Sequence, residues 1–178
     1  MNKSTVGILN IQGSVIEHSN ILRQLGVDFI LVRSKKDLEK ITRLIIPGGE
    51  STTLTVLLKS SGLWEELKKR AENKTLKIFG TCAGAILCQH FGLNAKIKRN
   101  GYGAQLNSFS AELESEQFPH LRGIFIRAPR FQSLGDNVKI LARYGNEPVL
   151  IQQDNLLAAA FHPELTDDTR VHKYFLNE

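Results

Sequence analysis

In the stretch Lys77-Ile78-Phe79-Gly80-Thr81-Cys82-Ala83-Gly84-Ala85-Ile86-Leu87, a short apolar run is followed by Gly-x-Cys-x-Gly and then by an apolar, helix-compatible segment. This order is typical of a nucleophile elbow, a sharp turn between a strand and a helix. Gly80 and Gly84 lack a Cβ, so the strand and the helix can approach closely. Cys82 is predicted to stand at the top of a sheet, where the helix N-terminus favours its thiolate. The alternative is a buried structural cysteine in a glycine-flanked turn.

Length and composition are those of an ordinary globular protein. The chain has 178 residues, of which 42% are hydrophobic and 23% charged, and we expect one domain over residues 1–178. Its two cysteines, Cys82 and Cys88, are not accompanied by a His or Cys cluster, so we expect neither a disulfide framework nor a metal site. The N-terminus shows neither a signal-peptide core nor a membrane span, which predicts a cytoplasmic protein.

The net charge of +5 comes from scattered positive residues. No aromatic residues interleave with them, and no nucleic-acid-binding motif is present. We therefore expect no nucleic-acid or membrane partner. We interpret the basic residues as parts of solvated surfaces. A second interpretation is that some of them contact an acidic surface of a partner.

In the first half of the chain, short apolar runs alternate with amphipathic segments. Strands are predicted at 6–9, 29–32 and 44–46, with a short helix near Leu38 and Ile41. Ser14 is predicted to cap a helix, and Glu17 three residues on would complete a capping box. This alternation predicts an α/β fold with an open, mostly parallel, twisted sheet and helices on both faces.

The rest of the chain contributes further helices and strands. Helical segments are predicted at 54–58 and 63–67, hinged at 60–62 with Trp64 in the core, and a short helix at 83–90. Further strands are predicted at 95–98, 107–113, 123–126, 138–142, 149–152 and 156–161. A terminal helix over 171–176 would be capped by Asp168 or Thr169.

The segment Pro47-Gly48-Gly49-Glu50-Ser51-Thr52-Thr53 follows the third predicted strand. Ligands of such sheets bind in the loops beyond the carboxyl ends of the strands. Adjacent glycines allow unusual peptide orientations, so Glu50, Ser51 and the opening N–H groups of the next helix could hold a polar ligand or an oxyanion. A Walker phosphate loop is excluded because the Gly-Lys-Ser/Thr is missing. The alternative is a glycine turn with a Ser/Thr cap.

The segment Phe161-His162-Pro163-Glu164 supplies a candidate base. A nucleophilic thiol needs a base, and the base needs an orienting partner. His162 follows an apolar strand and can reach the sheet edge where Cys82 is expected. In an extended segment, Glu164 would face the same side as His162 and could orient the imidazole. None of the other histidines, at 18, 90, 120 and 172, has such an adjacent carboxylate.

Together these motifs resemble those of the class I, triad-type glutamine amidotransferases, which have a flavodoxin-like fold. Within that class the chain resembles the glutaminase subunits of pyridoxal 5′-phosphate synthase, from Val6 to the terminal helix. The segments that carry this closer resemblance are Leu9-Asn10-Ile11-Gln12-Gly13, Glu17-His18, 47–53, Arg99-Asn100, Phe125-Ile126-Arg127-Ala128-Pro129 and 161–166.

The resemblance implies hydrolysis of L-glutamine to L-glutamate and ammonia, without a cofactor. The ammonia would pass to a synthase subunit that builds pyridoxal 5′-phosphate from ribose 5-phosphate and glyceraldehyde 3-phosphate. By this resemblance Cys82 is the nucleophile, His162 the acid/base and Glu164 its orienter. The substrate pocket it implies consists of Gly48 and Gly49, whose peptide supplies the oxyanion hole, and of Glu50, Ser51, Arg99, Ile126 and Arg127.

Two features depart from the family pattern. The region between Cys82 and Arg99 is shorter than usual, and Ala104 stands where a basic residue is common. Both bear on the pocket wall and the partner surface. Two other functions stay open: a non-catalytic, amidotransferase-like regulatory subunit, and a cysteine hydrolase of the same fold that acts on peptides.

Overall fold

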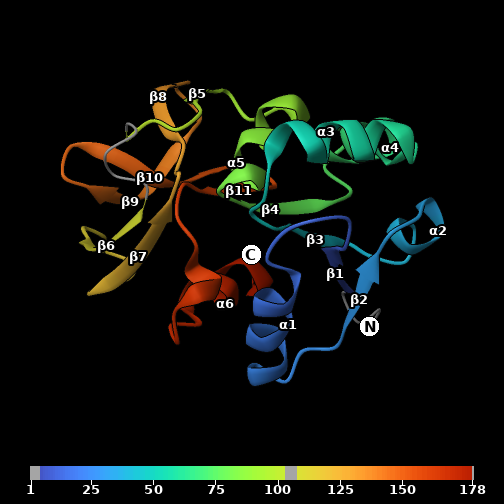
Figure 1. The fold of residues 1–178 in the computed structure, drawn as a ribbon, viewed down its shortest axis with the longest axis horizontal. Helices are drawn as coiled ribbons and strands as arrows, with labels where there is room; N and C mark the ends of the chain where they lie inside the picture. Colours follow the sequence, from blue (N-terminus) through green and yellow to red (C-terminus); the bar gives the residue numbers. More distant parts are fainter. Residues whose placement is uncertain (1–4, 103–107, 178) are drawn as a thin grey trace.

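A computed structural model describes residues 5–102 and 108–177 of the chain, and its centre is a seven-stranded sheet with the order β2-β1-β3-β4-β11-β10-β9 (Figure 1). The strands are β1 (Val6–Leu9), β2 (Phe29–Val32), β3 (Arg43–Ile46), β4 (Lys77–Thr81), β9 (Lys139–Tyr144), β10 (Glu147–Gln153) and β11 (Leu156–Ala159). The pairs from β2 to β11 are parallel, whereas β10 is antiparallel to both β11 and β9. The predicted open, mostly parallel sheet is confirmed.

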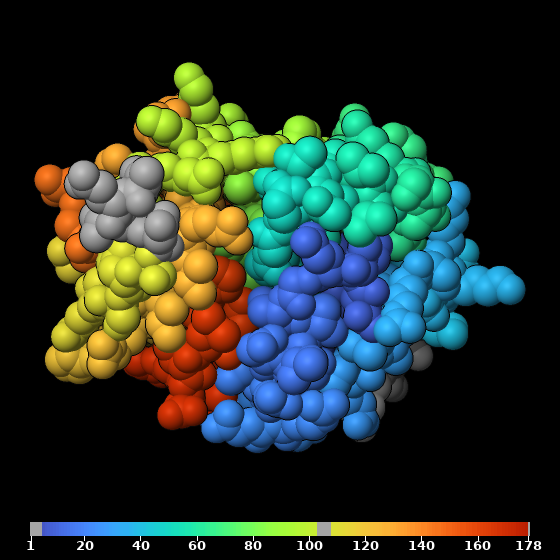
Figure 2. All heavy atoms as spheres, viewed as in Figure 1, coloured from blue at the N-terminus to red at the C-terminus, as the bar shows by residue number. Residues whose placement is uncertain are grey.

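Helices cover both faces of this sheet (Figure 1). They are α1 (Val15–Gln24), α2 (Lys35–Leu38), α3 (Ser51–Ser60), α4 (Leu63–Glu72), α5 (Ala83–Cys88) and α6 (Arg170–Asn177), with 3-10 turns η1 (Gln89–Phe91) and η2 (Pro163–Leu165). In Figure 1, α3, α4 and α5 lie on one face, and α1 and α6 on the other. Figure 2 shows the N-terminal segment, in blue, next to the C-terminal one, in red.

The central strands are apolar because both of their faces are covered. All four residues of β1 and of β11 are buried, and Ile45, Ile78 and Phe79 have no exposed surface. Such continuous apolar runs are typical of parallel strands between two layers of helices. The predicted hinge at 60–62 is confirmed, since Gly62 takes a left-handed backbone between α3 and α4 and Trp64 is buried.

Two small antiparallel sheets lie beside the central one. They pair β5 (Ala95–Lys98) with β8 (Arg130–Leu134), and β6 (Ser108–Leu113) with β7 (Leu121–Ile126). The sequence did not predict β8, whose order Arg-Phe-Gln-Ser-Leu does not alternate polar with apolar residues and in which Phe131 alone is buried. Asn107, the predicted start of the strand at 107–113, and Ala104 lie outside the described residues.

The capping box predicted at Ser14 and Glu17 is wrong. Ser14 is the N-cap of α1, but its side chain makes no capping hydrogen bond; its Oγ donates to Glu164 Oε1 at 2.6 Å instead. A capping box forms at α2, between Ser34 and Asp37. The hydroxyl of Ser14 is therefore used in a contact 150 residues away along the chain.

The last predicted strand, 156–161, is also too long. β11 ends at Ala159, and the following residues leave the sheet: the His162 N–H donates to the Ile124 carbonyl at 2.8 Å. His162 is thereby tied to β7 as well as to the central sheet. Among the described residues, no helix combines the length and apolarity needed to cross a membrane.

The two glycines of the elbow are required by close packing of backbone on backbone. A Cβ on Gly84 would lie 2.0 Å from the Ile46 carbonyl oxygen, and one on Gly80 would lie 2.4 Å from Gly84. Neither contact can be relieved by rotating a side chain, because the atoms involved are main-chain atoms. The close approach of β4 and α5 inferred from the sequence is confirmed.

We expect Gly84→Ala to lower the free energy of unfolding by about 3 kcal/mol, since the methyl group must push β3 from α5. Gly145→Ala is the control: its Cβ meets nothing within 4 Å, and only its left-handed backbone, φ 56°, opposes the change. That variant should lose about 1 kcal/mol. Urea denaturation measures both, and equal losses would contradict the close approach.

Candidate functional site

A cleft of about 500 Å³ opens at the carboxyl ends of β3 and β4. The predicted site residues that line it are Gly48, Gly49, Glu50, Ser51, Cys82, Arg99, Ile126, Arg127 and His162. Glu164 lies behind His162, out of the cleft lining. The structure thus brings together residues from five separate segments of the chain, at the sheet edge where ligands of open α/β folds bind.

Cys82 stands at the elbow between β4 and α5, with φ 50° and ψ −104°. A positive φ is unusual for a residue with a side chain, and such strain is typical of a nucleophile elbow. The Cys82 N–H donates to the Ala159 carbonyl at 2.8 Å, which fixes the turn to β11. Its sulfur is 3.6 Å from the Ile126 carbonyl oxygen, and 7% of the residue is exposed. The thiol therefore reaches the cleft from an otherwise buried turn.

His162 and Glu164 are in contact, although not for the predicted reason. The segment is not extended: Pro163, Glu164 and Leu165 form the 3-10 turn η2. This turn brings the Glu164 Oε1 to 2.8 Å from the Nδ1 of His162. Glu164 is 5% exposed and His162 is 7% exposed, so little water competes with the bond.

His162 and Cys82 meet beside Gly48. A Cβ placed on Gly48 would lie 2.5 Å from the His162 Cε1 and 3.3 Å from the Cys82 Cβ. Burial alone would lower the pKa of His162, but hydrogen bonds with Cys82 and Glu164 and the Glu164 charge raise this pKa to about 10. The imidazole is thus held as an imidazolium next to the sulfur.

Glu164 remains a carboxylate in spite of its burial. Burial opposes its ionisation, yet His18, His162 and the Ser14 hydroxyl together lower the pKa of Glu164 to about 2. A buried carboxylate stays ionised only where donors and positive charges surround it. Its negative charge in turn stabilises the protonated His162.

The loop after β3 is held in place through Gly48. The Gly48 N–H donates to the Thr81 Oγ1 at 3.1 Å, and its carbonyl accepts the Ser14 N–H at 3.1 Å. Glu50 is the N-cap of α3: its carboxylate accepts the N–H groups of Thr52 and Thr53, which lower the pKa of Glu50 to about 2. The Glu50 side chain therefore caps the helix, in place of the Ser/Thr cap that the sequence left open as an alternative.

Two arginines stand at the mouth of the cleft. The Arg99 Nη1 donates to the Thr52 Oγ1 at 2.8 Å, which orients its guanidinium over the start of α3. Arg127 follows β7 with φ 46°, another left-handed backbone at a cleft residue. Both side chains are exposed and line the cleft. The mouth is accordingly positive and suits a carboxylate.

Several polar residues around the site were not singled out from the sequence. Gln12 lines the cleft, and its Oε1 accepts the Glu50 N–H at 3.2 Å. Thr81, His18 and His172 surround Glu164 or its neighbours, and each is fully buried. The available signals were the elbow motif for Thr81 and the Glu17-His18 segment of the resemblance for His18. His172 gave none, because only the folded chain brings it there.

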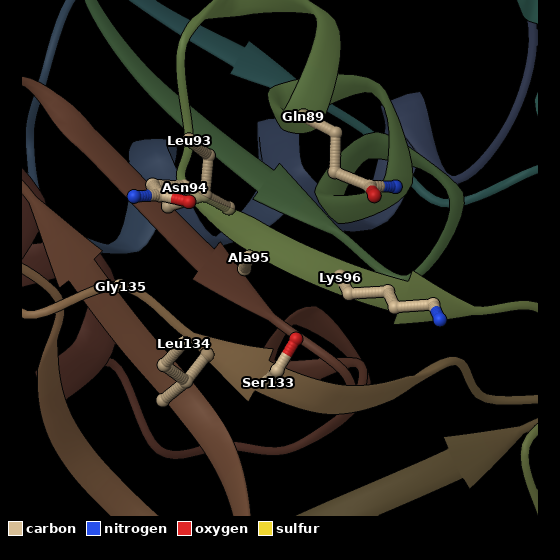
Figure 3. A pocket seen from close by; sticks show the side chains of 8 residues that line it. All are labelled: Gln89, Leu93, Asn94, Ala95, Lys96, Ser133, Leu134 and Gly135. Atoms are coloured by element: carbon tan, nitrogen blue, oxygen red, sulfur yellow. The ribbon is translucent and has the colours of Figure 1, made fainter.

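The region between α5 and β5 borders a second hollow, of about 450 Å³ (Figure 3). Gln89 and Leu93 stand on one side of it, and Ser133 and Leu134 on the other. Lys96 is the charged residue of its lining, and the hollow shares no lining residue with the cleft. Its lining offers no acid–base pair.

The fold has counterparts among known proteins. A solved structure described as a glutamine amidotransferase has 45% sequence identity and a TM-score of 0.91, with 97% of each chain covered. A putative GMP synthase subunit from Thermoplasma acidophilum shares the fold, with a TM-score of 0.76 at 18% identity. The architecture is therefore that of the class I glutamine amidotransferases.

Sequence comparison narrows this class. Residues 8–178 match the SNO glutamine amidotransferase family, and the chain belongs to that family. A protein of Thermus thermophilus named pyridoxal 5′-phosphate synthase subunit PdxT is 46% identical, with 98% of this chain and 97% of the relative covered. A protein of the same name from Thermosipho africanus is 44% identical, with 97% of each covered. The expected enzyme class, a glutamine-hydrolysing amidotransferase, is confirmed.

The buried His172 predicts a loss of stability in mild acid. Burial and the neighbouring His18 lower the pKa of His172 to about 3, so between pH 6.5 and 3 the unfolded chain binds a proton that the folded chain does not. Stability must then fall as the pH falls, by about 2 kcal/mol for this group between pH 6.5 and 5.

Urea denaturation at pH 6.5 and 5 should show this loss in the wild type and a smaller one in His172→Gln. His120→Gln, at an exposed histidine paired with Glu112, is the control and should follow the wild type. Parallel losses in the wild type and His172→Gln would contradict the prediction.

Proposed function

We propose that this chain is the glutaminase subunit of a pyridoxal 5′-phosphate synthase and that it hydrolyses L-glutamine with Cys82, His162 and Glu164. The observation that carries the proposal is that His162 bonds to Glu164 and lies beside Cys82 at the cleft, with Gly48 next to both. A chain of this family needs such a nucleophile and base, and its named relatives are subunits of that synthase.

The reaction follows from the geometry. The Cys82 thiolate attacks the side-chain amide carbon of glutamine, and the carbonyl oxygen becomes an oxyanion. Protonated His162 gives its proton to the amide nitrogen as the C–N bond breaks, which releases ammonia and leaves a glutamyl thioester. His162 then takes a proton from water, the resulting hydroxide attacks the thioester, and glutamate leaves as the thiolate is restored. The net reaction adds one water to glutamine.

The oxyanion is assigned to two backbone donors. The N–H of Gly49 points opposite to the Gly48 carbonyl, which is bonded to Ser14, and the N–H of Ala83 opens α5 directly after the nucleophile. Donors aimed at a developing oxyanion contribute a few kcal/mol to barrier lowering, and no reorganisation is needed when they are fixed in advance.

The glutamine backbone is assigned to the mouth of the cleft. Arg99 and Arg127 suit its α-carboxylate, as charge-assisted contacts, while Ser51 and the main chain of Glu50 and Ile126 suit its polar groups. The Glu50 carboxylate is engaged at the start of α3, so Glu50 acts through its main chain in this proposal.

The ammonia is proposed to pass to the synthase subunit, which uses it to build pyridoxal 5′-phosphate. Residues 1–178 are proposed to form one glutaminase domain, in line with the continuous core from β1 to α6. We also propose a cytoplasmic location, because a free nucleophilic thiol is kept active in a reducing compartment.

A glutaminase assay on the complex with the synthase tests the proposal. Cys82→Ala should lower kcat by about four orders of magnitude. Cys88→Ala is the matched control: this second thiol is fully buried, and burial raises its pKa to about 12, so the variant should keep its activity. Without the synthase, the wild type should be slower.

Full activity in Cys82→Ala would overturn the triad. Two further measurements separate the alternatives. A glutamine-mimicking electrophile should label Cys82, and absence of labelling would favour a regulatory subunit. Faster hydrolysis of peptides than of glutamine would favour a peptide hydrolase.

A further inference from the structure

Behind the triad, on the side of Glu164 turned away from the cleft, lies a group of fully buried polar side chains. His18 from α1, Thr81 from β4 and His172 from α6 each have no exposed surface. They come from three elements that are far apart in the chain, and none of them lines the cleft. Since burying polar groups is costly unless they bond, their arrangement calls for an explanation.

His18 is the centre of this group. Its Nδ1 is 2.9 Å from the His172 Nε2, and its Nε2 is 3.2 Å from the Thr81 Oγ1 and 3.5 Å from the Glu164 Oε1. The imidazole thus spans the distance between the C-terminal helix and the carboxylate of the triad. Thr81 also accepts the Gly48 N–H, so the same group reaches the loop beside the nucleophile.

The partners of His18 select one tautomer. Ionised Glu164 can only accept, so the His18 Nε2 carries the hydrogen that faces Glu164 and Thr81. The His18 Nδ1 then accepts from the His172 Nε2. The His172 Nδ1, which has no partner among the described residues, is left with a lone pair rather than an N–H. An unpaired N–H is the rarer feature of buried sites, so this assignment is favoured.

We propose that His18 is a positioning residue for the glutaminase reaction: through its Nε2–H, which bonds to the Thr81 Oγ1 and faces the Glu164 Oε1 at 3.5 Å, it holds the Glu164 carboxylate toward His162, and His172 locks the tautomer that makes this possible. The inference rests on the proposed triad and extends it by two residues, one on α1 and one on α6. His18 acts through Glu164 and does not touch the substrate.

The charges around His18 fit this role. It is faced by Glu164 and His162 at η2, by Glu17 on its own helix and by His172 on α6, while Asp168 faces His172. Burial lowers the pKa of His18, and the pKa of His172 falls as well, so the pair is neutral near pH 7. Near pH 7 His18 therefore supports the carboxylate as a neutral donor and does not compete with His162 for its charge; the charge through which His18 lowers the pKa of Glu164 belongs to the protonated form of His18 at lower pH.

The test compares His18→Leu with His18→Gln in the complex with the synthase. The leucine variant removes the donor and should lower kcat about tenfold with little change in KM. Glu164 then loses the N–H that faces it, so its carboxylate is protonated more easily. The acidic limb of the kcat profile, where Glu164 takes up a proton, should therefore move to higher pH by about one unit. Glutamine places an amide N–H near the position of the imidazole Nε2 and should restore most of kcat and the wild-type pH profile.

Ser19→Ala is the matched control on the same helix. Ser19 is buried, and its hydroxyl bonds only to the Val15 carbonyl within α1, so this variant should keep the wild-type kcat and pH profile. His172→Phe keeps a ring against Phe79 but loses the Nε2–H, and should shift the acidic limb in the same direction as His18→Leu. If His18→Leu does not fold, His172→Phe takes its place in the test.

Two outcomes would overturn the proposal. One is a folded His18→Leu with the wild-type kcat and pH profile. The other is a loss of kcat that glutamine does not restore and that leaves the pH profile unchanged, which indicates a purely structural role. Failure of the triad itself is recognised separately, because Cys82→Ala would then stay active.

Discussion

The site depends on the hydrogen bond between the His162 Nδ1 and the Glu164 Oε1, which is 2.8 Å long. Both residues are buried, so little water reaches the bond. A carboxylate buried alone would take up a proton, and the imidazole would lose both its orientation and its charge. Ser14 and His18, both from the segment that opens α1, bring donors to the same Oε1 of Glu164. The ionised carboxylate keeps His162 protonated, and protonated His162 can pair with the Cys82 thiolate.

The sheet explains how a sulfur near the middle of the chain meets an imidazole near its end. β4 and β11 are neighbouring parallel strands in which Thr81 is in register with Ala159, so both segments leave the sheet at the same edge. Gly80 and Gly84 let α5 start immediately at that edge, with its N–H groups free beside the sulfur. The nucleophile and its base are therefore placed by the backbone. The orientation of the base is set by the side chain of Glu164, which Ser14 and His18 contact in turn.

Local patterns predicted the features that depend on local physics. Apolar runs of four residues revealed the buried parallel strands, and the elbow glycines revealed the turn at Cys82. The contact of His162 with Glu164 was predicted, but through an extended segment instead of the 3-10 turn that forms. The approach of His162 to Cys82 was predicted from the strand ends, but other long-range side-chain contacts could not be predicted. The Ser14 hydroxyl had a plausible local partner and took a distant one, and the bond of His18 with His172 exists only because α1 and α6 pack on the same face of the sheet.

The most direct test of this account is a pH titration of the His162 ring by NMR in protein with isotope-labelled histidine, with the signal assigned from its absence in His162→Gln. The account predicts that His162 stays protonated until about pH 10, and that Glu164→Gln moves this titration to lower pH. A His162 that titrates near 6.5, the ordinary value for histidine, in the wild type and in Glu164→Gln alike would contradict it.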